Sequence, residues 1–489
     1  MSKRNRRQFL EESMLATAAA VAANSGGKVF GQDQPQSKSP NERLNVCVVG
    51  VNGRGSSHLG AFANGPGRKD TVITHICDVD QGVGGKKAEE VGKRQGGITP
   101  KFEEDIRKVL EDKSVDIVTI ATPNHWHSLA AAWAIMAGKD VYVEKPVSHN
   151  VSEGRRVVEN ARVHKRICQT GTQCRSNPGL IQAIDYVKSG KIGELKVARG
   201  LCYKRRPSIG PRGVYEVPKG VNYDLWCGPA PMGPLTRPKF HYDWHWQWDF
   251  GNGDLGNQGI HQMDIARWGL GIDELCKSVF SYGGRLGYED AGETANTQVV
   301  VCDYDKQSLV FEVRGLETKH YKGAGVGVIF EGTDGYLVIP SYDTGVAFDK
   351  DGNKVQEFTG SADHFANFLA AVRSRKHTDL TADILEGHLS SALCHLGNIS
   401  YRLGTKMGTE AAWKTIEKAK TTDNAKDTFE RTMAHLKDNK LDLASVELSV
   451  GPVLPLNPKT ERFTENEAAN KMLTRDYRKG FEVPGAGTA

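Results

Sequence analysis

Short apolar segments alternate with amphipathic ones over the first third of the chain. The segments typical of buried strands are Asn45–Val49, Thr71–Cys77, Val115–Ala121 and Val141–Val143. Between them, Phe102–Glu111 and the alanine-rich stretch that ends at Ala137 have the pattern of helices. Strand–helix alternation with short connections predicts an α/β fold with a doubly wound parallel sheet over residues 44–163.

The second half of the chain has a different pattern. Glycine-rich turns separate three β-rich runs, Thr297–Val301, Ser308–Val313 and Gly327–Glu331, which is typical of hairpins. Helical patterns follow at His364–Arg373 and Ile384–Leu403. We expect a second α/β domain over residues 164–404, which binds substrate and forms the contacts of a homo-oligomer. Residues 405–489 are charged and partly helical, and we expect them to form a C-terminal extension.

The first 33 residues have the pattern of an export signal. The motif RRQFL at residues 6–10 precedes a short alanine-rich core that runs from Met14 to Ala23. This arrangement resembles a twin-arginine signal peptide, which exports folded proteins. We expect residues 1–33 to be that signal, residues 34–43 to be a linker, and the protein to be periplasmic or otherwise extracytoplasmic. A basic, unstructured tail is the alternative interpretation.

Composition and charge argue against several classes of function. Of 489 residues, 25% are charged and 38% are hydrophobic, which is ordinary for a globular protein. The net charge of +5 comes from 64 basic and 59 acidic side chains without a long basic block, so we expect no nucleic-acid partner. No run after the signal reaches the ~18 apolar residues of a membrane helix. The nine cysteines form no CxxC pair, which favours buried thiols over a disulfide framework or a zinc site.

A glycine-rich turn follows the first predicted strand and precedes a predicted helix. Its sequence, GVNGRGSSH, places Gly50 and Gly55 at the outer glycines of a GxGxxG pattern and Asn52 at the middle one. Asparagine tolerates left-handed backbone angles better than most residues, so this departure is mild. Glycines let main-chain N–H groups approach a pyrophosphate at a helix N-terminus. The turn therefore indicates a dinucleotide site.

Asp78 ends the second predicted strand, 28 residues after Gly50. A carboxylate at this place accepts hydrogen bonds from a ribose 2′-OH and repels a 2′-phosphate, which favours NAD without excluding NADP. A solvated aspartate at a strand end is the alternative. Because ligands bind beyond the carboxyl ends of parallel strands, we expect Gly50, Asp78, Thr122–His127 and Lys145 to meet at one site.

Five motifs resemble the Gfo/Idh/MocA oxidoreductase family. They are GVNGRG at 50–55, CDVD at 77–80, ATPNHWH at 121–127, AGKDVYVEKP at 137–146 and GDLGNQGIHQMD at 253–264. The resemblance implies an N-terminal NAD(P)-binding Rossmann domain and a C-terminal α/β domain with a large open, mainly antiparallel sheet. The implied reaction is hydride transfer between a nicotinamide cofactor and a hydroxyl-bearing carbon of a sugar, polyol or sugar derivative.

The resemblance also implies roles for single residues. Lys145 matches the family's lysine that contacts the reacting hydroxyl, and His261 matches the histidine that acts as acid and base. The family often has an aspartate four residues before that histidine, where this chain has Asn257. An amide can orient the ring or bind substrate, but it cannot raise the basicity of His261 as a carboxylate would. The residues expected to bind the cofactor are Gly50, Asn52, Gly53, Arg54, Gly55, Asp78, Thr122, Asn124, His127, Glu144 and Lys145.

Elementary chemistry is consistent with these roles. Oxidising an alcohol requires a base within hydrogen-bond reach of the hydroxyl while the carbon loses hydride. Lys145 serves either as a charged donor to the hydroxyl, or as a base once burial and the nicotinamide charge lower its pKa. His261 has a pKa suited to proton transfer, and in a helix it would share one face with Asn257 and Asp264. A surface lysine and a buried core histidine are the alternatives. No metal site is expected, because the HxxD pattern lacks a third ligand.

The stretch His241–Phe250 holds three of the eight tryptophans. Interleaved aromatic and polar side chains suit stacking against a sugar ring, and they equally suit a hydrophobic strand that packs the second domain. Gln169–Arg175 follows a predicted strand and either lines the same cleft or forms an ordinary connection. The residues expected to bind substrate are Asn257, Asp264, Gln173, Arg175, Trp244 and Trp246.

Three functions are compatible with these observations. The first is an exported NAD(P)-dependent dehydrogenase that acts on a sugar or polyol. The second is a glycoside hydrolase or lyase that uses tightly bound NAD for a transient oxidation and elimination. The third is a non-catalytic sugar-binding or partner-binding protein on the same fold, which the asparagine at position 257 keeps open.

Overall fold

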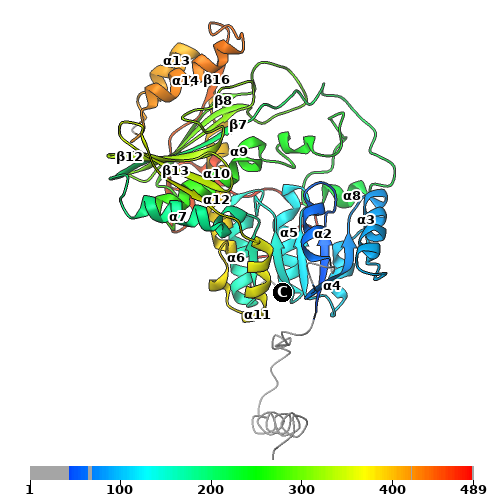
Figure 1. Cartoon of the computed structure of the whole chain (residues 1–489). Coiled ribbons are helices and arrows are strands. Elements are labelled where there is room, and N and C mark those ends of the chain that lie inside the picture. Colours follow the sequence, from blue (N-terminus) through cyan, green and yellow to red (C-terminus); the bar gives the residue numbers. More distant parts are fainter. Residues whose placement is uncertain (1–42, 64–68, 420, 487–489) are drawn as a thin grey trace, which may run out of the picture. The chain divides into compact units, whose positions relative to one another are not determined.

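The computed structural model describes residues 43–63, 69–419 and 421–486, all of which belong to one compact unit. The predicted signal peptide of residues 1–33 and nearly all of the predicted linker lie outside the described residues. The chain builds two sheets in succession, the first entirely parallel and the second largely antiparallel (Figure 1). The predicted α/β fold is therefore confirmed.

The first sheet has six parallel strands in the order β3-β2-β1-β4-β5-β6. Its strands are β1 (Leu44–Val49), β2 (Thr71–Cys77), β3 (Lys101–Glu103), β4 (Ile117–Ile120), β5 (Asp140–Val143) and β6 (Cys168–Thr170). Its helices are α2 (Gly55–Phe62), α3 (Gln81–Arg94), α4 (Ile106–Glu111), α5 (Asn124–Met136) and α6 (Val151–Val163). The central strands β4 and β5 are buried throughout, because helices cover both faces of the sheet.

Two boundaries differ from the sequence expectation. The helix predicted over Phe102–Glu111 is wrong in its first half, because Lys101–Glu103 pair with β2 and the helix starts only after Asp105. The Asp105 carboxylate accepts a hydrogen bond from the Arg107 N–H and so fixes that start. Strand β6 follows residue 163, so the parallel sheet extends beyond the predicted end of the first domain.

The second sheet has twelve strands and is antiparallel except where β10 runs parallel to β7. Its main path is β14-β13-β12-β11-β7-β10-β9-β8-β16-β15, and β17 joins at β8. Its strands are β7 (Leu195–Tyr203), β8 (Ser278–Gly284), β9 (Thr297–Asp303), β10 (Ser308–Arg314), β11 (Val326–Gly332), β12 (Gly335–Ile339), β13 (Thr344–Asp349), β14 (Lys354–Thr359), β15 (Thr405–Gly408), β16 (Glu447–Val450), β17 (Leu454–Asn457) and β18 (Arg462–Phe463).

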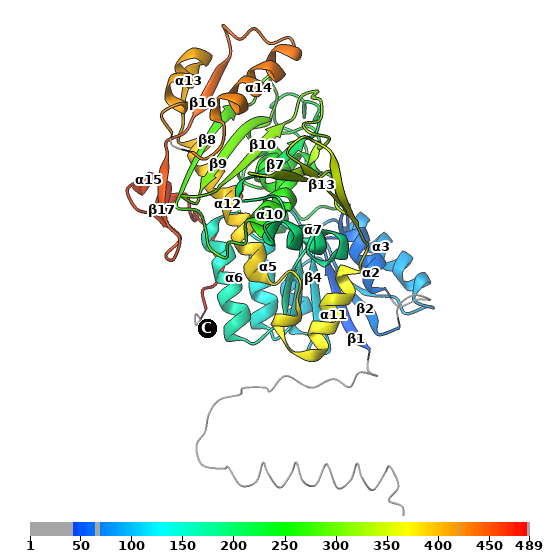
Figure 2. The ribbon, with the colours of Figure 1, turned by 60° about the vertical axis from the view of Figure 1, so that its left-hand side comes forward.

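Different helices cover the two faces of this sheet (Figure 2). Toward the first sheet lie α7 (Pro178–Lys188), α10 (Gly259–Leu270) and α12 (Ile384–Arg402), in one hydrophobic cluster with Phe311 and Phe330. On the other face lie α13 (Thr409–Ile416) and α14 (Ala425–Asp438). The remaining helices are η1 (Gln173–Ser176), α8 (Tyr223–Cys227), η2 (Asp243–Trp246), α9 (Gly253–Asn257), α11 (His364–Ser374), η3 (His377–Asp379) and α15 (Glu467–Lys471).

The C-terminal residues are integrated into both layers. Strands β15 and β16 extend the second sheet at one edge. Further on, Arg155 of α6 forms an ion pair with Glu461, and Phe481 packs among the side chains of α5. The described residues of the predicted 405–489 extension therefore pack against both domains.

All nine cysteines lie within the described residues, and each is free and buried, as the sequence predicts. Within the described ranges no helix is long and apolar enough to cross a membrane. The same ranges hold no group of three or more histidine, cysteine, aspartate or glutamate side chains that could hold a metal ion.

Candidate active site

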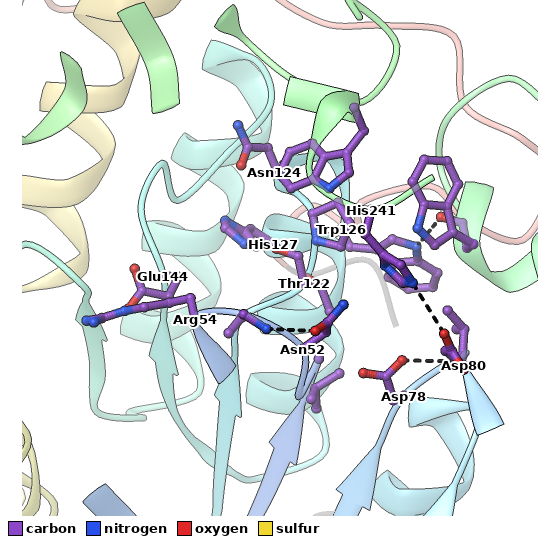
Figure 3. A pocket seen from close by; sticks show the side chains of 18 of the residues that line it. Asn52, Arg54, Asp78, Asp80, Thr122, Asn124, Trp126, His127, Glu144 and His241 are labelled. Carbon is purple, nitrogen blue, oxygen red and sulfur yellow. Dashed lines mark hydrogen bonds and ion pairs between the residues drawn. The ribbon is translucent and has the colours of Figure 1, made fainter. Parts of the chain in front are cut away.

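A pocket of about 540 Å³ lies at the carboxyl ends of β1, β2, β4 and β5 (Figure 3). Residues of the first domain form one side of it, and residues that follow β7 form the other. The pocket lies where open parallel sheets bind ligands, and its volume is within the ~300–1,000 Å³ usual for small-molecule sites.

The turn after β1 requires glycine at two positions for steric reasons. Gly50 has φ of +77°, and a Cβ added there would lie 2.8 Å from the main-chain nitrogen of Thr122. A Cβ at Gly55 would lie 1.9 Å from the carbonyl oxygen of Gly50. Both glycines are therefore required for the close turn, and the turn opens directly into helix α2. This is the cradle that a dinucleotide pyrophosphate needs.

Asp78 stands at the end of β2 and lines the pocket, as predicted. Its carboxylate accepts hydrogen bonds from the main-chain N–H groups of Val51 (2.8 Å) and Asp80 (3.0 Å). Burial raises the pKa of Asp78. The carboxylate thus ties the glycine turn to the next strand. Asp80, Glu104 and Asp105 line the same end of the pocket, which makes it rich in acidic groups.

Glu144 is the buried anion beneath the glycine turn. Arg54 Nε donates to Glu144 Oε1 at 2.6 Å, and His58 Nε2 lies 3.2 Å from the same oxygen. Burial alone would raise the pKa of this carboxyl, but the His58 hydrogen bond and the Arg54 charge outweigh it and hold the pKa well below its usual range. Figure 3 shows Arg54 and Glu144 side by side at one end of the pocket.

Lys145 follows at the end of β5 and lines the pocket. Its Nζ donates to the main-chain carbonyl of Asn257 at 2.6 Å and lies 3.5 Å from the Asn257 side-chain oxygen. Burial lowers the pKa of Lys145 to about 8, even though the neighbouring Glu144 raises it. The contact with Asn257 joins the two domains at the pocket.

His261 belongs to α10 and lines the same pocket as Lys145. The ring is buried, and its Nδ1 has no hydrogen-bond partner among the residues that the structure describes. Burial, and after it the charge of Lys145, lower the pKa of His261 well below its ordinary value. The Tyr342 ring packs edge-on against His261, with 5.2 Å between the ring centroids. The imidazole is therefore neutral at neutral pH.

Most of the predicted cofactor residues line the pocket. These are Gly50, Asn52, Gly53, Arg54, Asp78, Thr122, Asn124, His127, Glu144 and Lys145. Gly55 lies behind them, at the first turn of α2. His127 already uses both ring nitrogens, one with the Pro146 carbonyl and one with the Thr122 carbonyl, so it braces the loop that carries Lys145.

The predicted substrate residues separate into two groups. Gln173, Trp244 and Asn257 line the pocket. Asp264 and Arg175 lie outside it and form a buried ion pair, with Asp264 also bonded to Ser390. Of the three residues expected to share a helix face, Asn257 and His261 both line the pocket, whereas Asp264, further along α10, does not.

The aromatic stretch is a 3₁₀ turn and not the strand that one interpretation required. Trp244 stacks on His245 at 3.6 Å between ring centroids, and both line the pocket. Trp246 lies outside the pocket and packs under Arg206. The stretch therefore serves both the site and the packing of the second domain.

Several pocket residues were missed by the sequence reasoning. They are Asp80, Leu225, Trp226 and Phe240. Asp80 belongs to the CDVD motif, where a second acid could have been noticed. Leu225, Trp226 and Phe240 come from a segment far along the chain, with no motif to link them to the glycine turn. His245, from the aromatic stretch, also lines the pocket, and burial lowers its pKa to about 3.

The fold and the pocket define a Rossmann dinucleotide-binding protein. Two family models match the chain: "Oxidoreductase family, NAD-binding Rossmann fold" over residues 44–172, and "Oxidoreductase family, C-terminal alpha/beta domain" over residues 210–436. Together they match more than half of the chain. The chain belongs to the Gfo/Idh/MocA oxidoreductase family, and it carries the family's NAD-binding domain.

The single proteins with similar sequences include both a glycosyl hydrolase and a dehydrogenase by name. The chain is 31% identical over 212 residues to glycosyl hydrolase family 109 protein 2 of Shewanella sp. strain ANA-3. The aligned region covers 40% of this chain and 45% of that protein. It is 30% identical over 179 residues to inositol 2-dehydrogenase of Salmonella typhimurium, 36% of this chain and 50% of that protein. The chain thus spans about half the length of the curated relatives it matches.

Solved structures share the fold. The WlbA dehydrogenase of Bordetella pertussis, solved in complex with NADH and UDP-GlcNAcA, matches with a TM-score of 0.55 over 74% of this chain and 97% of that chain. Its sequence identity to this chain is 19%, so the match supports the fold alone.

Proposed function

We propose that the protein is an NAD-dependent oxidoreductase that acts on a CH–OH group of a sugar, polyol or sugar derivative. One observation carries the proposal: Lys145 and His261, which come from different domains, line the same pocket as the glycine turn and Asp78. The turn fits the dinucleotide, because a Cβ at Gly50 or Gly55 would clash with neighbouring main chain and prevent the close turn at the N-terminus of α2 that a pyrophosphate needs.

The two side chains divide the work on the substrate hydroxyl. When bound, the nicotinamide supplies the hydride acceptor. His261 is neutral, because burial and the charge of Lys145 lower its pKa, and so it accepts the hydroxyl proton. Lys145 is charged below pH of about 8 and donates to the hydroxyl oxygen, while the Asn257 carbonyl holds its ammonium in place.

The acidic end of the pocket favours NAD over NADP. Asp78, Asp80, Glu104 and Asp105 line that end, and a 2′-phosphate would lie among like charges. We expect NAD to bind at least about tenfold more tightly than NADP, which corresponds to ~1.4 kcal/mol. Titration of the cofactor-free protein with each nucleotide measures this ratio, and equal affinities would remove the argument.

A substrate panel tests the proposed reaction. Purified protein with NAD supplied is mixed with sugars, polyols and sugar acids, and the absorbance of reduced nicotinamide is followed. We expect at least one compound to reduce the cofactor, and Lys145→Met to abolish that signal. A Lys93→Met variant serves as the control, because Lys93 is an exposed lysine of α3 that does not line the pocket. A protein that does not bind NAD would end the proposal.

The second candidate is a glycoside hydrolase or lyase that oxidises its substrate transiently with resident NAD. The similarity to a glycosyl hydrolase family 109 protein favours it. Nitrophenyl glycosides distinguish the two functions, because release of nitrophenol without net reduced nicotinamide indicates transient oxidation. A protein that binds these sugars and shows neither signal would instead be a non-catalytic binding protein.

We also propose export by the twin-arginine route and assembly as a homo-oligomer. The RRQFL motif supports export. Replacing both arginines of the motif by lysine is expected to leave the protein in the cytoplasm of its host, as shown by fractionation. Light scattering on the purified protein measures the assembly, and a mass of 53.5 kDa would contradict an oligomer.

A further inference from the structure

One residue of the aromatic stretch has a strained backbone. Tyr242 has φ of +69° and ψ of −48°, and across it the N–H of Asp243 donates to the carbonyl of His241 at 2.9 Å. This is a γ-turn of the rare form with positive φ, which persists only where the surrounding structure holds it. Among the described non-glycine residues with positive φ, Tyr242 is the one that lines the pocket.

The turn sends two successive side chains to different parts of the pocket. His241 Nε2 lies 3.3 Å from Asp80 Oδ2, at the acidic end (Figure 3). The hydroxyl of Tyr242, the next residue, instead accepts a hydrogen bond from Arg206 Nη1 at 3.0 Å. Both side chains line the pocket. The strained turn is therefore what lets neighbouring residues reach separate partners in one site.

The partner of the Tyr242 hydroxyl is tied to the helix that holds Lys145. Arg206 is buried and donates twice to the carboxylate of Asp254, from Nε to Oδ2 (2.9 Å) and from Nη2 to Oδ1 (2.6 Å). Asp254 belongs to α9, which ends at Asn257, and the Asn257 carbonyl accepts the hydrogen bond from Lys145. One short helix thus sets the positions of both the tyrosine hydroxyl and the lysine ammonium.

His245 braces the turn from the other side. The Tyr242 carbonyl accepts hydrogen bonds from the His245 N–H at 3.2 Å and from the His245 ring nitrogen Nδ1. The centroids of the two rings are 4.6 Å apart. Burial lowers the pKa of His245 to about 3, and the charge of Lys145 acts in the same direction. The Tyr242 ring therefore packs beside a neutral imidazole that lies within reach of the Lys145 charge.

These contacts fix Tyr242 at its hydroxyl and its main chain and leave the ring open. The residue is 52% exposed, although it lines a pocket and its neighbour His245 is buried. A fixed aromatic ring in a pocket offers an apolar face to a ligand, and a ligand that covers this face removes it from water.

We propose that Tyr242 determines substrate specificity: its ring packs against the C–H face of a ring-shaped sugar or cyclitol while Lys145 and His261 act on the hydroxyl. The inference rests on the proposed function. A closed ring presents its C–H groups as one patch, whereas an open-chain polyol must first lose conformational freedom to do so. Glycine would relieve the strain at residue 242 but would carry no ring, which explains why a tyrosine occupies this turn.

Steady-state kinetics of the full chain with NAD test the inference, on the panel compound that the chain oxidises best. We expect that compound to be a ring form. Tyr242→Ala should raise KM at least about tenfold and leave kcat and NAD affinity within about threefold, because the ring binds ground state and transition state alike. Tyr242→Phe keeps the ring and loses one hydrogen bond, so its KM should stay within about threefold of the unaltered value.

Thermal unfolding tests the strain without a substrate. Tyr242→Gly and Tyr242→Ala lose the same ring, but only glycine adopts the positive φ without a Cβ penalty. We therefore expect Tyr242→Gly to unfold at a higher temperature than Tyr242→Ala, while both show the same raised KM. Lys440→Gly is the matched control for KM, because Lys440 is exposed, has φ of +64° and does not line the pocket. Its KM should equal that of the unaltered chain.

The outcomes separate this inference from the function it rests on. An unchanged KM in Tyr242→Ala, a Tyr242→Phe variant as impaired as Tyr242→Ala, or a best substrate that is an open-chain polyol overturns the inference and leaves the oxidoreductase in place. A lower unfolding temperature for Tyr242→Gly than for Tyr242→Ala overturns it as well. If Tyr242→Ala fails to fold, as judged by circular dichroism, Tyr242→Gly carries the kinetic test. A chain that oxidises no compound of the panel overturns both the proposed function and the inference.

Discussion

At the scale of single residues, the pocket holds two basic groups in opposite protonation states. Burial lowers the pKa of both Lys145 and His261, but Lys145 falls only to about 8 whereas His261 falls well below its ordinary value. A window of pH therefore exists in which the amine is charged and the imidazole is neutral. Orienting the hydroxyl and removing its proton both depend on that window.

We predict a bell-shaped dependence of kcat/KM on pH. Activity rises as His261 loses its proton, below the ordinary histidine pKa, and falls as Lys145 loses its proton near pH 8. Lys145→Arg keeps its charge to pH ~12, so its alkaline limb should disappear while the acidic limb stays. Lys93→Arg, at an exposed lysine of α3 away from the pocket, should leave both limbs unchanged. An alkaline limb near pH 8 in Lys145→Arg would show that another group titrates there.

A second prediction concerns Gly55. In Gly55→Ala the new Cβ would lie 1.9 Å from the Gly50 carbonyl oxygen, so the glycine turn must move. We expect a loss of ~1–3 kcal/mol in the free energy of unfolding and little NAD binding, measured by urea unfolding and nucleotide titration. Gly85→Ala is the matched control, because nothing lies within 4 Å of that Cβ. Normal NAD binding by Gly55→Ala would show that the turn is not the pyrophosphate cradle.

At the scale of elements, a buried ionic cluster attaches α14 to the second sheet. Glu312 of β10 accepts hydrogen bonds from Arg199 (2.8 Å) and Arg431 (2.8 and 2.9 Å) and from the Tyr203 hydroxyl (2.6 Å). Burial would raise the pKa of Glu312, but the surrounding arginines hold it well below its usual range. Helix α14 thus stays in place through charge as well as apolar contact.

We expect Glu312→Ala to lower the free energy of unfolding by ~3–5 kcal/mol, because it leaves buried arginines without their anion. Asp427→Ala removes the outer partner of the same Arg431, at a half-exposed position, and should cost less than ~1 kcal/mol. Denaturant unfolding of both variants checks the difference. Equal losses of unfolding free energy in the two variants would mean that the buried Glu312 contributes no more to stability than the half-exposed Asp427.

Elements of the first domain could be predicted because their signals are local. The apolar run of β1 leads into Gly50, the run of β2 ends at Asp78, and the run of β5 ends at Lys145, so topology alone brings these ends together. The short strand β3 escaped prediction, because the helical pattern of Phe102–Glu111 masks the cap at Asp105.

Placement of side chains around His261 could not be predicted in the same way. Spacing suggested that Asp264 shares a face with Asn257 and His261, but of the three only Asn257 and His261 line the pocket. Asp264 instead forms a buried ion pair with Arg175, a partner from another element that spacing along one helix cannot reveal. Tyr342, which contacts His261, comes from the turn between β12 and β13, and nothing local in its sequence signals that contact.

At the scale of the whole molecule, the pocket exists only because the two domains meet. The glycine turn and Lys145 come from the first domain, whereas His261 and the pocket residues between Leu225 and His245 come from the second. The hydrogen bond from Lys145 to the Asn257 carbonyl crosses this interface at the site. The hydrogen bond from Trp126 to the Leu225 carbonyl could not be predicted from sequence, because it joins residues about a hundred positions apart.

The central claim is that Lys145 and His261 act on the same hydroxyl beside one bound NAD. Single-turnover formation of reduced nicotinamide measures it directly, on a substrate found in the panel and at equal NAD occupancy. At that matched occupancy, Lys145→Met and His261→Asn should each slow the step by ~10²–10⁴-fold. If either variant forms reduced nicotinamide at the unaltered rate, that side chain has no part in the reaction and the account fails.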